Sequence, residues 1–300
     1  MRTLIYIMTP VLILTFLFAS RFVSWDRLKN VDTEAVKHIN DATRFIRKGR
    51  YYQAITELTQ AIEIEPRYAQ AYIQRGRANY HLTRYKEAID DYTKTLSFKR
   101  YIADAHASRG DVHHALGDIP QAITDYTASI KKRKNALVMS KRAQSFLETG
   151  QVDEALADYN YIIKRRPSAI AYYNRGSAYY QKFLRLHEAE ETLKLALSDF
   201  DKAIELAPQF AIAYLSRGDV YNDLGQQQSN NEDYAKAIDL LTNAIENWQK
   251  NADGLLTIYL WRAVAYKKQD YDEAAETDLK KVYSLYTHFF LNKLSVSDIL

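Results

Sequence analysis

The chain has 300 residues, of which 47% are hydrophobic and 26% are charged, a composition typical of a folded protein and not of a disordered one. Its 41 Lys and Arg residues exceed its 37 Asp and Glu residues by 41 − 37 = 4, too small an excess to indicate a nucleic acid or an anionic surface as partner. The sequence contains no cysteine, which excludes disulfides, thiolate catalysis and cysteine-ligated metals.

Residues 3–20 form an uncharged, mostly apolar run between Arg2 and Arg21. A helix of this length spans about 27 Å, close to the roughly 30 Å of a bilayer core. A cleaved signal peptide needs small residues at the last and third-last positions before the cut, and here Leu17 or Phe18 takes the third-last place. We therefore expect one transmembrane helix, with a secreted or periplasmic repeat protein with a cleaved signal peptide as the alternative.

The chain is expected to divide into residues 1–24 as the anchor or signal segment, residues 25–34 as a short linker, 35–285 as the main array, and 286–300 as a capping helix. A short N-terminal tail usually stays inside the cell, which favours an extracytoplasmic (periplasmic) location for the rest of a single-pass membrane protein. The capping helix is expected because Phe289, Phe290, Leu291 and Leu294 supply an apolar face that can cover the last repeat.

A pair of amphipathic helices recurs along the array with a period of about 34 residues. In residues 119–130, for example, apolar side chains follow the i, i+3, i+4, i+7 spacing of one helix face. We number repeat positions from the first residue of each unit. The units begin at Ala35, Ala69, Ala103, Ala136, Ala169, Ala211 and Leu256.

Certain positions of the repeat keep their character from unit to unit. Position 8 is small: Ala42, Gly76, Gly110, Ala143, Gly176, Gly218 and Ala263. Position 20 is Ala54, Ala88, Ala122, Ala155, Ala196, Ala237 and Ala275, once insertions in the fifth and sixth units are allowed for. Position 24 is bulky: Leu58, Tyr92, Tyr126, Tyr159, Phe200, Leu241 and Leu279. Small residues at positions 8 and 20 let two helices approach, and the bulky residue at position 24 fills the space beside them.

This pattern resembles the tetratricopeptide repeat, which also ends its second helix with proline at position 32, as at Pro66, Pro167 and Pro208. The resemblance implies an all-α fold, a right-handed superhelical solenoid of about seven helical hairpins. The fifth and sixth units carry insertions of eight and seven residues, which we place at the turn inside each hairpin, where they project from one edge. In the fifth unit we expect the second helix to be longer by about two turns.

Arginine at position 7 distinguishes this chain from the common pattern of the family. It stands beside the small residue at position 8, and position 23 is acidic in six units, so we predict ion pairs within a repeat or between neighbours. The alternative is that each arginine stem packs while its charged head reaches water. The predicted pairs involve Arg75, Arg109, Arg142, Arg175 and Arg217 with Asp91, Asp125, Asp158 and Asp199, together with Arg262, Glu57 and Asp278.

The resemblance implies a concave groove lined by positions 2, 5, 9, 12 and 13 of the first helices. Tyrosine suits such a surface because it offers a large contact area with a polar tip. The predicted groove residues are Arg77, Tyr80, His81, Asp111, His114, Gln144, Tyr173, Ser177, Tyr180, Asp219 and Asn222.

The sequence favours a non-enzymatic scaffold that binds a protein or peptide in this groove close to a membrane. No catalytic constellation, phosphate-binding loop, cofactor motif or small-molecule site is predicted, and neighbouring His113 and His114 point in different directions on a helix, which disfavours a metal. The alternative is an RNA-binding helical repeat, which requires a continuous basic groove. Asp111, Asp219 and Asp223 oppose it, so no nucleic acid is expected.

Overall fold

A computed structural model describes residues 33–186, 189–248 and 252–294. These residues form helices joined by short turns, in two compact parts that meet at Val138 and Met139. The helices of the first part are α2 (Thr33–Arg47), α3 (Tyr51–Ile64), α4 (Ala69–His81), α5 (Tyr85–Ser97), α6 (Ile102–Ala115) and α7 (Ile119–Lys132).

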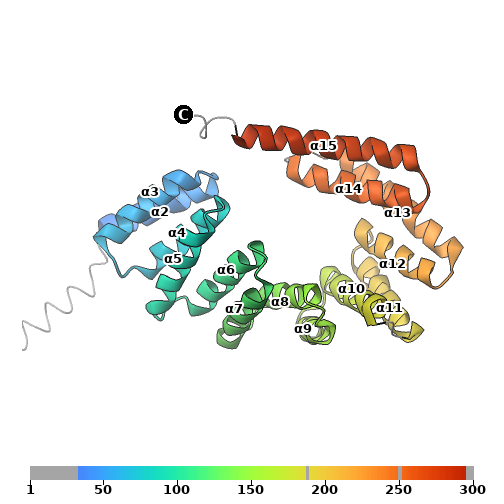
Figure 1. The fold of residues 1–300 in the computed structure, drawn as a ribbon, viewed down its shortest axis with the longest axis horizontal. Coiled ribbons are helices and arrows are strands. Elements are labelled where there is room, and N and C mark those ends of the chain that lie inside the picture. The colour runs from blue at the N-terminus through green and yellow to red at the C-terminus, as the bar shows by residue number, and fades with distance from the viewer. Residues whose placement is uncertain (1–32, 187–188, 249–251, 295–300) are drawn as a thin grey trace, which may run out of the picture. The chain divides into compact units, whose positions relative to one another are not determined.

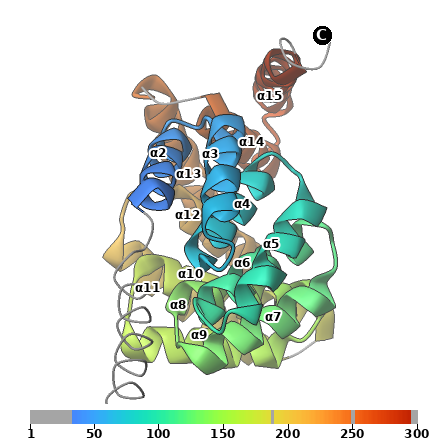
Figure 2. The ribbon, with the colours of Figure 1, turned by 90° about the vertical axis from the view of Figure 1, so that its left-hand side faces the viewer.

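The second part begins within α8 (Ala136–Glu148). It continues with α9 (Val152–Arg165), α10 (Ala169–Leu186), α11 (Glu190–Leu206), α12 (Ala211–Asp223), α13 (Gln227–Glu246), α14 (Ala252–Lys268) and α15 (Asp272–Leu294). Consecutive helices pack as hairpins, α2 with α3 and α4 with α5 in the first part, and α10 with α11 and α12 with α13 in the second (Figure 1). Figure 2 shows α2 and α3 lying side by side. The all-helical, hairpin-by-hairpin organisation is therefore confirmed for the described residues.

The hairpin turns depend on one residue in the left-handed region of backbone space. Gly49, Gly117, Gly150 and Gly225 all stand at position 15 with φ between +69° and +79°. Glycine adopts this conformation without the steric cost that a Cβ brings. Thr83 and Asp270 take the same place in their own hairpins, each with φ of +59°. The turn geometry is thus common to hairpins with and without glycine.

In the hairpins that have glycine at position 8, close packing joins this position of the first helix to position 24 of the second. A Cβ built on Gly76 would lie 2.7 Å from the ring of Tyr92, and one on Gly218 would lie 2.7 Å from the ring of Tyr234. Tyr92 is 1% exposed, so the ring fills a space that the missing side chain leaves. The predicted role of the small residue at position 8 is confirmed.

The insertion in the fifth repeat lies at the hairpin turn, as predicted, but it lengthens both helices and not the second alone. First helix α10 has 18 residues where α4 has 13, and second helix α11 has 17 where α5 has 13. The leucines near this turn, Leu184, Leu186 and Leu195, are about half exposed. An elongated hairpin thus carries apolar side chains at its tip.

The predicted insertion at the hairpin turn of the sixth repeat is wrong. Gly218 meets Tyr234, 16 residues further along, which is the same separation as between Gly76 and Tyr92 in an uninterrupted repeat. The turn therefore has its ordinary length, and α13 carries the extra residues, since it has 20 residues. Asn230, and not Ala237, occupies position 20 of this repeat.

The separate capping helix predicted for residues 286–300 is replaced, as far as Leu294, by a continuation of α15, which runs without interruption from Asp272. The predicted anchor and linker, residues 1–24 and 25–34, lie outside the described residues except for the last two positions of the linker. Among the helices that the structure describes, none combines the length and apolar character needed to cross a bilayer.

Candidate functional site

The position-7 arginines form two-pronged ion pairs with a carboxylate of the second helix in their own hairpin. Arg217 donates from Nε to Asp233 Oδ2 at 2.8 Å and from Nη2 to Asp233 Oδ1 at 2.7 Å. The pairs Arg75–Asp91, Arg109–Asp125, Arg142–Asp158, Arg175–Asp199 and Arg262–Asp278 have the same geometry. A planar guanidinium matches a carboxylate in this way, which fixes the angle between the two helices as well as their separation.

The third guanidinium nitrogen, Nη1, reaches a polar side chain at position 25 of the preceding repeat. Arg75 donates to Thr59, Arg109 to Thr93, Arg175 to Asn160 and Arg217 to Asp201, at distances of 2.6–3.2 Å. Each of these arginines therefore ties together three helices from two repeats. The ion pairs thus run within a repeat, and the Arg217–Asp201 pair also joins neighbouring repeats, so both arrangements that the sequence leaves open occur.

The aspartates of these pairs are buried, while the arginine side chains remain roughly one-fifth exposed. Burial raises the pKa of Asp233, and the hydrogen bonds and charge of Arg217 only partly reverse this. Burial likewise raises the pKa of Asp91 against the opposing effect of Arg75 and Asn79. The arginines thus oppose the effect of burial and favour the ionised form of these carboxylates.

Tyrosine at position 4, where the resembled family often has Trp or Leu, has a structural reason. The guanidinium carbon of Arg217 lies 5.5 Å from the ring centroid of Tyr214 at position 4 and 5.8 Å from that of Tyr221 at position 11. Arg175 and Arg262 have the same pair of aromatic neighbours. The rings cover the exposed faces of the cation while its edges bind the carboxylates.

Histidine takes over part of this role in two repeats. In the first repeat position 7 is Asp41, and His38 Nδ1 lies 2.6 Å from the Glu57 carboxylate at position 23. In the third repeat His106 Nδ1 lies 2.8 Å from Asp125, which Arg109 also binds. These two histidines therefore bind carboxylates of their own hairpins, and no group of His, Asp and Glu among the described residues is arranged to hold a metal.

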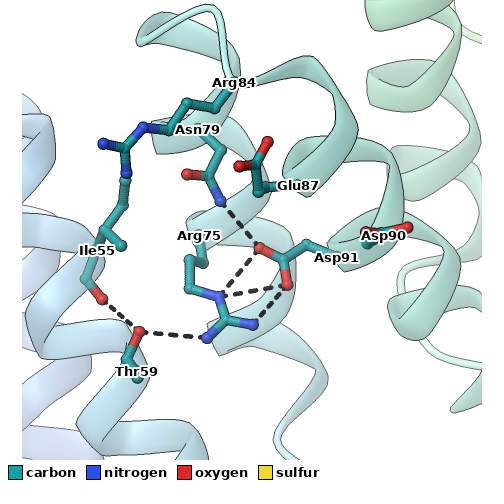
Figure 3. Close-up of a pocket in the computed structure, with 8 residues that line it drawn as sticks. All are labelled: Ile55, Thr59, Arg75, Asn79, Arg84, Glu87, Asp90 and Asp91. Atoms are coloured by element: carbon teal, nitrogen blue, oxygen red, sulfur yellow. Dashed lines mark hydrogen bonds and ion pairs between the residues drawn. The ribbon is translucent and has the colours of Figure 1, made fainter.

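A hollow of about 300 Å³ opens beside the Arg75–Asp91 pair. Figure 3 shows Asn79 and Arg75 converging on the Asp91 carboxylate, with Thr59 below and Arg84, Glu87 and Asp90 around the rim. The convergent groups already bind one another: Asn79 Nδ2 donates to Asp91 at 3.3 Å, and Arg75 Nη1 donates to Thr59 at 3.2 Å. This hollow belongs to the structural ion-pair system.

In the second part of the chain, two predicted groove residues of α10, Tyr180 and Tyr173, contact residues of the neighbouring first helix α12. Tyr180 of α10 donates a hydrogen bond of 2.8 Å to Asp223 of α12, and Ser216 of α12 lies 3.5 Å from the hydroxyl of Tyr173. Burial raises the pKa of Tyr180, and its hydrogen bond to Asp223 raises it further. These positions therefore lie on one shared face of α10 and α12.

Asp219, a predicted groove residue of α12, is bound by two groups that sequence reasoning missed. Tyr234 donates to it at 2.8 Å, and Lys268 Nζ lies 2.8 Å from the same oxygen, Oδ1. Asn222 accepts a bond of 3.3 Å from Asn230. Gln144 is exposed and Ser177 is half-buried; both remain predictions.

In the first part, the predicted groove residues fall into an aromatic group and a polar one. Tyr80 lies against His81, with ring centroids 5.8 Å apart, and Tyr51 of α3 stacks on His81 at 4.6 Å. Tyr126 donates to Asp111 at 2.9 Å. Arg77 is exposed and His114 half-buried on α4 and α6 respectively.

Asp233 is the ion-pair residue that the sequence alignment missed. The constant separation of 16 residues between arginine and aspartate, seen in four other repeats, is the signal that identifies it. The same separation fixes Tyr234 at position 24 and assigns the extra turns of α13 to the far end of that helix.

Two family models match parts of the chain, one described as a tetratricopeptide repeat over residues 140–198 and one described as a TPR repeat over residues 43–83. No curated protein sequence matches. Among solved structures, a tetratricopeptide repeat protein from Parabacteroides merdae is 19% identical with a TM-score of 0.64, over 84% of this chain and 93% of its own.

The C-terminal part of a TPR repeat-containing protein from Cytophaga hutchinsonii is 19% identical with a TM-score of 0.57, over 82% of this chain and 95% of its own. YrrB, described as a TPR protein with an unusual peptide-binding site, is 24% identical with a TM-score of 0.50, over 63% of this chain and 94% of its own. At these identities the likeness extends to the fold. The helical hairpins, their packing of position 8 on position 24 and the two family matches agree: the chain carries tetratricopeptide repeats, which the family models match over residues 43–83 and 140–198.

Proposed function

We propose that this protein is a non-enzymatic scaffold that holds a protein or peptide partner on the face formed by its first helices. The observation that carries the proposal is the set of contacts between α10 and α12, in which Tyr180 binds Asp223 and Ser216 lies by Tyr173. These contacts between α10 and α12 support a binding face that extends over successive repeats. Repeat proteins use such extended surfaces for binding.

The chemistry of this face suits a polypeptide. Tyrosines offer apolar ring area with a hydroxyl at the tip, and the carboxylates of Asp219 and Asp223 accept hydrogen bonds from amide or cationic groups. The same carboxylates repel phosphates, so a polypeptide is favoured over RNA.

We further propose that the scaffold acts close to a membrane, with residues 3–20 as its anchor and the repeats on the extracytoplasmic side. The support is the uncharged apolar run between Arg2 and Arg21 and the shortness of the link that follows it. Washing membranes with alkaline carbonate tests the anchor: the protein should stay with the membrane, and its release would contradict the proposal.

Partner binding can be tested by capture from membrane extracts with the full-length protein. Ser177→Trp places a large side chain on the proposed face and should abolish capture of the partner. Lys202→Trp is the matched control, because Lys202 lies on second helix α11 and its side chain is 44% exposed. Equal capture by the two variants would contradict the assignment of the binding face.

A further inference from the structure

The first and last helices that the structure describes, α2 and α15, carry altered residues at the contact that joins a first helix to the repeat before it. That contact runs from the position-7 arginine to an acceptor at position 25, as from Arg75 to Thr59 and from Arg217 to Asp201. At the ends the residue types change: position 7 of α2 is Asp41, and position 25 of α15 is Lys280. The acceptor, Asp41, thus stands at position 7 and the donor, Lys280, at position 25, which reverses the order of the internal contacts. The two side chains carry opposite charges.

The outer face of α15 is more exposed than the same face elsewhere. Leu279 stands at position 24 and is 42% exposed, whereas Tyr92, Tyr126, Tyr159 and Phe200 at this position are at most 2% exposed. One and two turns further along, Tyr283 is 71% exposed and Tyr286 is 53% exposed. These three residues follow the i, i+4, i+7 spacing of a single apolar stripe, which we call the α15 stripe.

Further charges match when α2 is placed on α15 in the antiparallel arrangement of an internal junction. Figure 3 shows this arrangement between α3 and α4: Arg75 lies by Thr59 at one level, and Asn79, one turn further along α4, lines the same hollow as Ile55, one turn back along α3. Positions that face one another therefore add up to about 32, since 7 + 25 = 32 and 11 + 21 = 32.

Applied to the ends, this rule places Asp41 at position 7 opposite Lys280 at position 25. It places Arg44 at position 10 opposite Glu276 at position 21, and Lys48 at position 14 opposite Glu273 at position 18. Within one chain Arg44 binds Asp41 at 2.7 Å and Lys280 binds Glu276 at 2.9 Å, and all four side chains are between 30% and 74% exposed. Docking would join the two exposed pairs into one network of alternating charges.

We propose that α2 of one copy of this chain docks on α15 of a second copy, so that the protein associates head to tail through a junction that imitates its internal ones. The α15 stripe supplies apolar area to this junction, and the stem of Arg44 can lie along it. The charges select the second copy's α2 and disfavour an ordinary first helix, because an arginine at position 7 would face Lys280. A head-to-tail contact is heterologous, so it extends into filaments when the rotation between copies does not close a ring, and the proposed assembly is the filament.

Charge reversal in the full-length protein, kept in a mild nonionic detergent and followed by sedimentation velocity over a concentration series, tests this proposal. The wild type should assemble as concentration rises. Asp41→Lys and Lys280→Asp each set like charges against one another and should weaken assembly at least about tenfold. The double variant Asp41→Lys with Lys280→Asp restores opposite charges and should assemble like the wild type. Helix content by circular dichroism verifies that each variant is folded.

Mixing the two single variants in equal amounts tests whether the two positions meet between copies. The reversed α2 of the Asp41→Lys variant then faces the reversed α15 of the Lys280→Asp variant, and their unchanged ends also carry opposite charges. The mixture should therefore assemble like the wild type, although each variant alone stays monomeric. Growth beyond the dimer as concentration rises distinguishes head-to-tail association from a symmetric pair, and assembly that stops at dimers would overturn the filament arrangement.

Lys236→Asp, an exposed position on α13 that forms an i, i+3 pair, is the control and should leave assembly unchanged. A wild type that is monomeric at all concentrations, or a double variant no better than the single ones, would overturn the proposal. The groove function would stand in either case.

Discussion

Replacing Arg217 by methionine removes a cation that holds two carboxylates from two helices. Asp233 is 4% exposed and receives bonds of 2.8 and 2.7 Å, whereas Asp201 is 54% exposed and receives one of 2.6 Å. Removing one partner of a buried pair costs about 3–5 kcal/mol, because the remaining charge stays buried without compensation. The exposed contact adds at most about 1 kcal/mol. Asp233 thus accounts for most of the expected loss.

The assay is urea unfolding followed by tryptophan fluorescence, because Trp261 packs against the cluster that contains Tyr234. With an m-value of about 1–3 kcal/mol per M urea, the midpoint of this transition should fall by at least about 1 M. Adding Asp233→Leu to Arg217→Met should recover most of the loss, since the uncompensated charge is then gone. Lys236→Met, which breaks an exposed pair, is the control. An unfolding free energy within about 0.5 kcal/mol of that control would show that the arginine head merely reaches water and refute the reasoning.

Three further predictions concern packing, backbone and titration. Gly110→Ala puts a Cβ 2.8 Å from the ring of Tyr126 and should lower the unfolding free energy by about 1–3 kcal/mol; an unchanged urea midpoint would contradict the close-packing role. Thr83→Gly should raise that free energy by roughly 0.5–1 kcal/mol, because a β-branched residue leaves a turn with φ of +59°, and a thermal midpoint below the wild type's would argue against strain there. Burial acts to raise the pKa of Asp125, but hydrogen bonds from Arg109 and His106 outweigh burial, and the pKa is lowered. The ionised Asp125 carboxylate therefore stabilises the folded state above the unfolded pKa of about 4, and this stabilisation is lost as the pH falls through the lower pKa of the folded state. His106→Gln should therefore move the acid-unfolding midpoint to higher pH, which circular dichroism can follow, and an unmoved midpoint would contradict the coupling.

The sequence predicts the hairpins well because small and bulky positions repeat with helical spacing, and it fails where that spacing has two equivalent solutions. Seven residues make almost two full helical turns, so moving along α13 by seven returns to nearly the same face. Ala237 and Leu241 consequently match positions 20 and 24 as well as Asn230 and Tyr234 do. The two alignments differ in one respect: only the one with Tyr234 at position 24 puts an acidic residue, Asp233, 16 residues after Arg217.

The extra turns of α13 shift the position at which the seventh hairpin docks on this helix, and the helical periodicity of the sequence does not reveal the shift. Arg262 donates to Thr242, nine positions after Asp233, whereas the corresponding pair on α5, Asp91 and Thr93, is two positions apart. The seventh hairpin therefore docks seven residues further along α13, a displacement of about 10 Å at 1.5 Å per residue. A hollow of about 520 Å³ between α13 and the end of α14 accompanies it.

The contacts among first-helix residues were predictable only in outline, because they depend on how neighbouring first helices are spaced. Helical periodicity indicates that Tyr180 and Asp219 lie on the exposed side of their helices. It gives no means of pairing Tyr180 with Asp223, 43 residues away, or of bringing Lys268 to Asp219. Those contacts require the stacked hairpins.

Site-specific photo-crosslinking in intact cells tests most directly whether the first-helix face holds a partner. A photoreactive amino acid at Asn222, an exposed residue of α12, is compared with one at Lys236, an exposed residue of second helix α13. The account predicts a discrete crosslinked protein species from position 222 that is missing from position 236. The same species from both positions, or from position 236 alone, would contradict it.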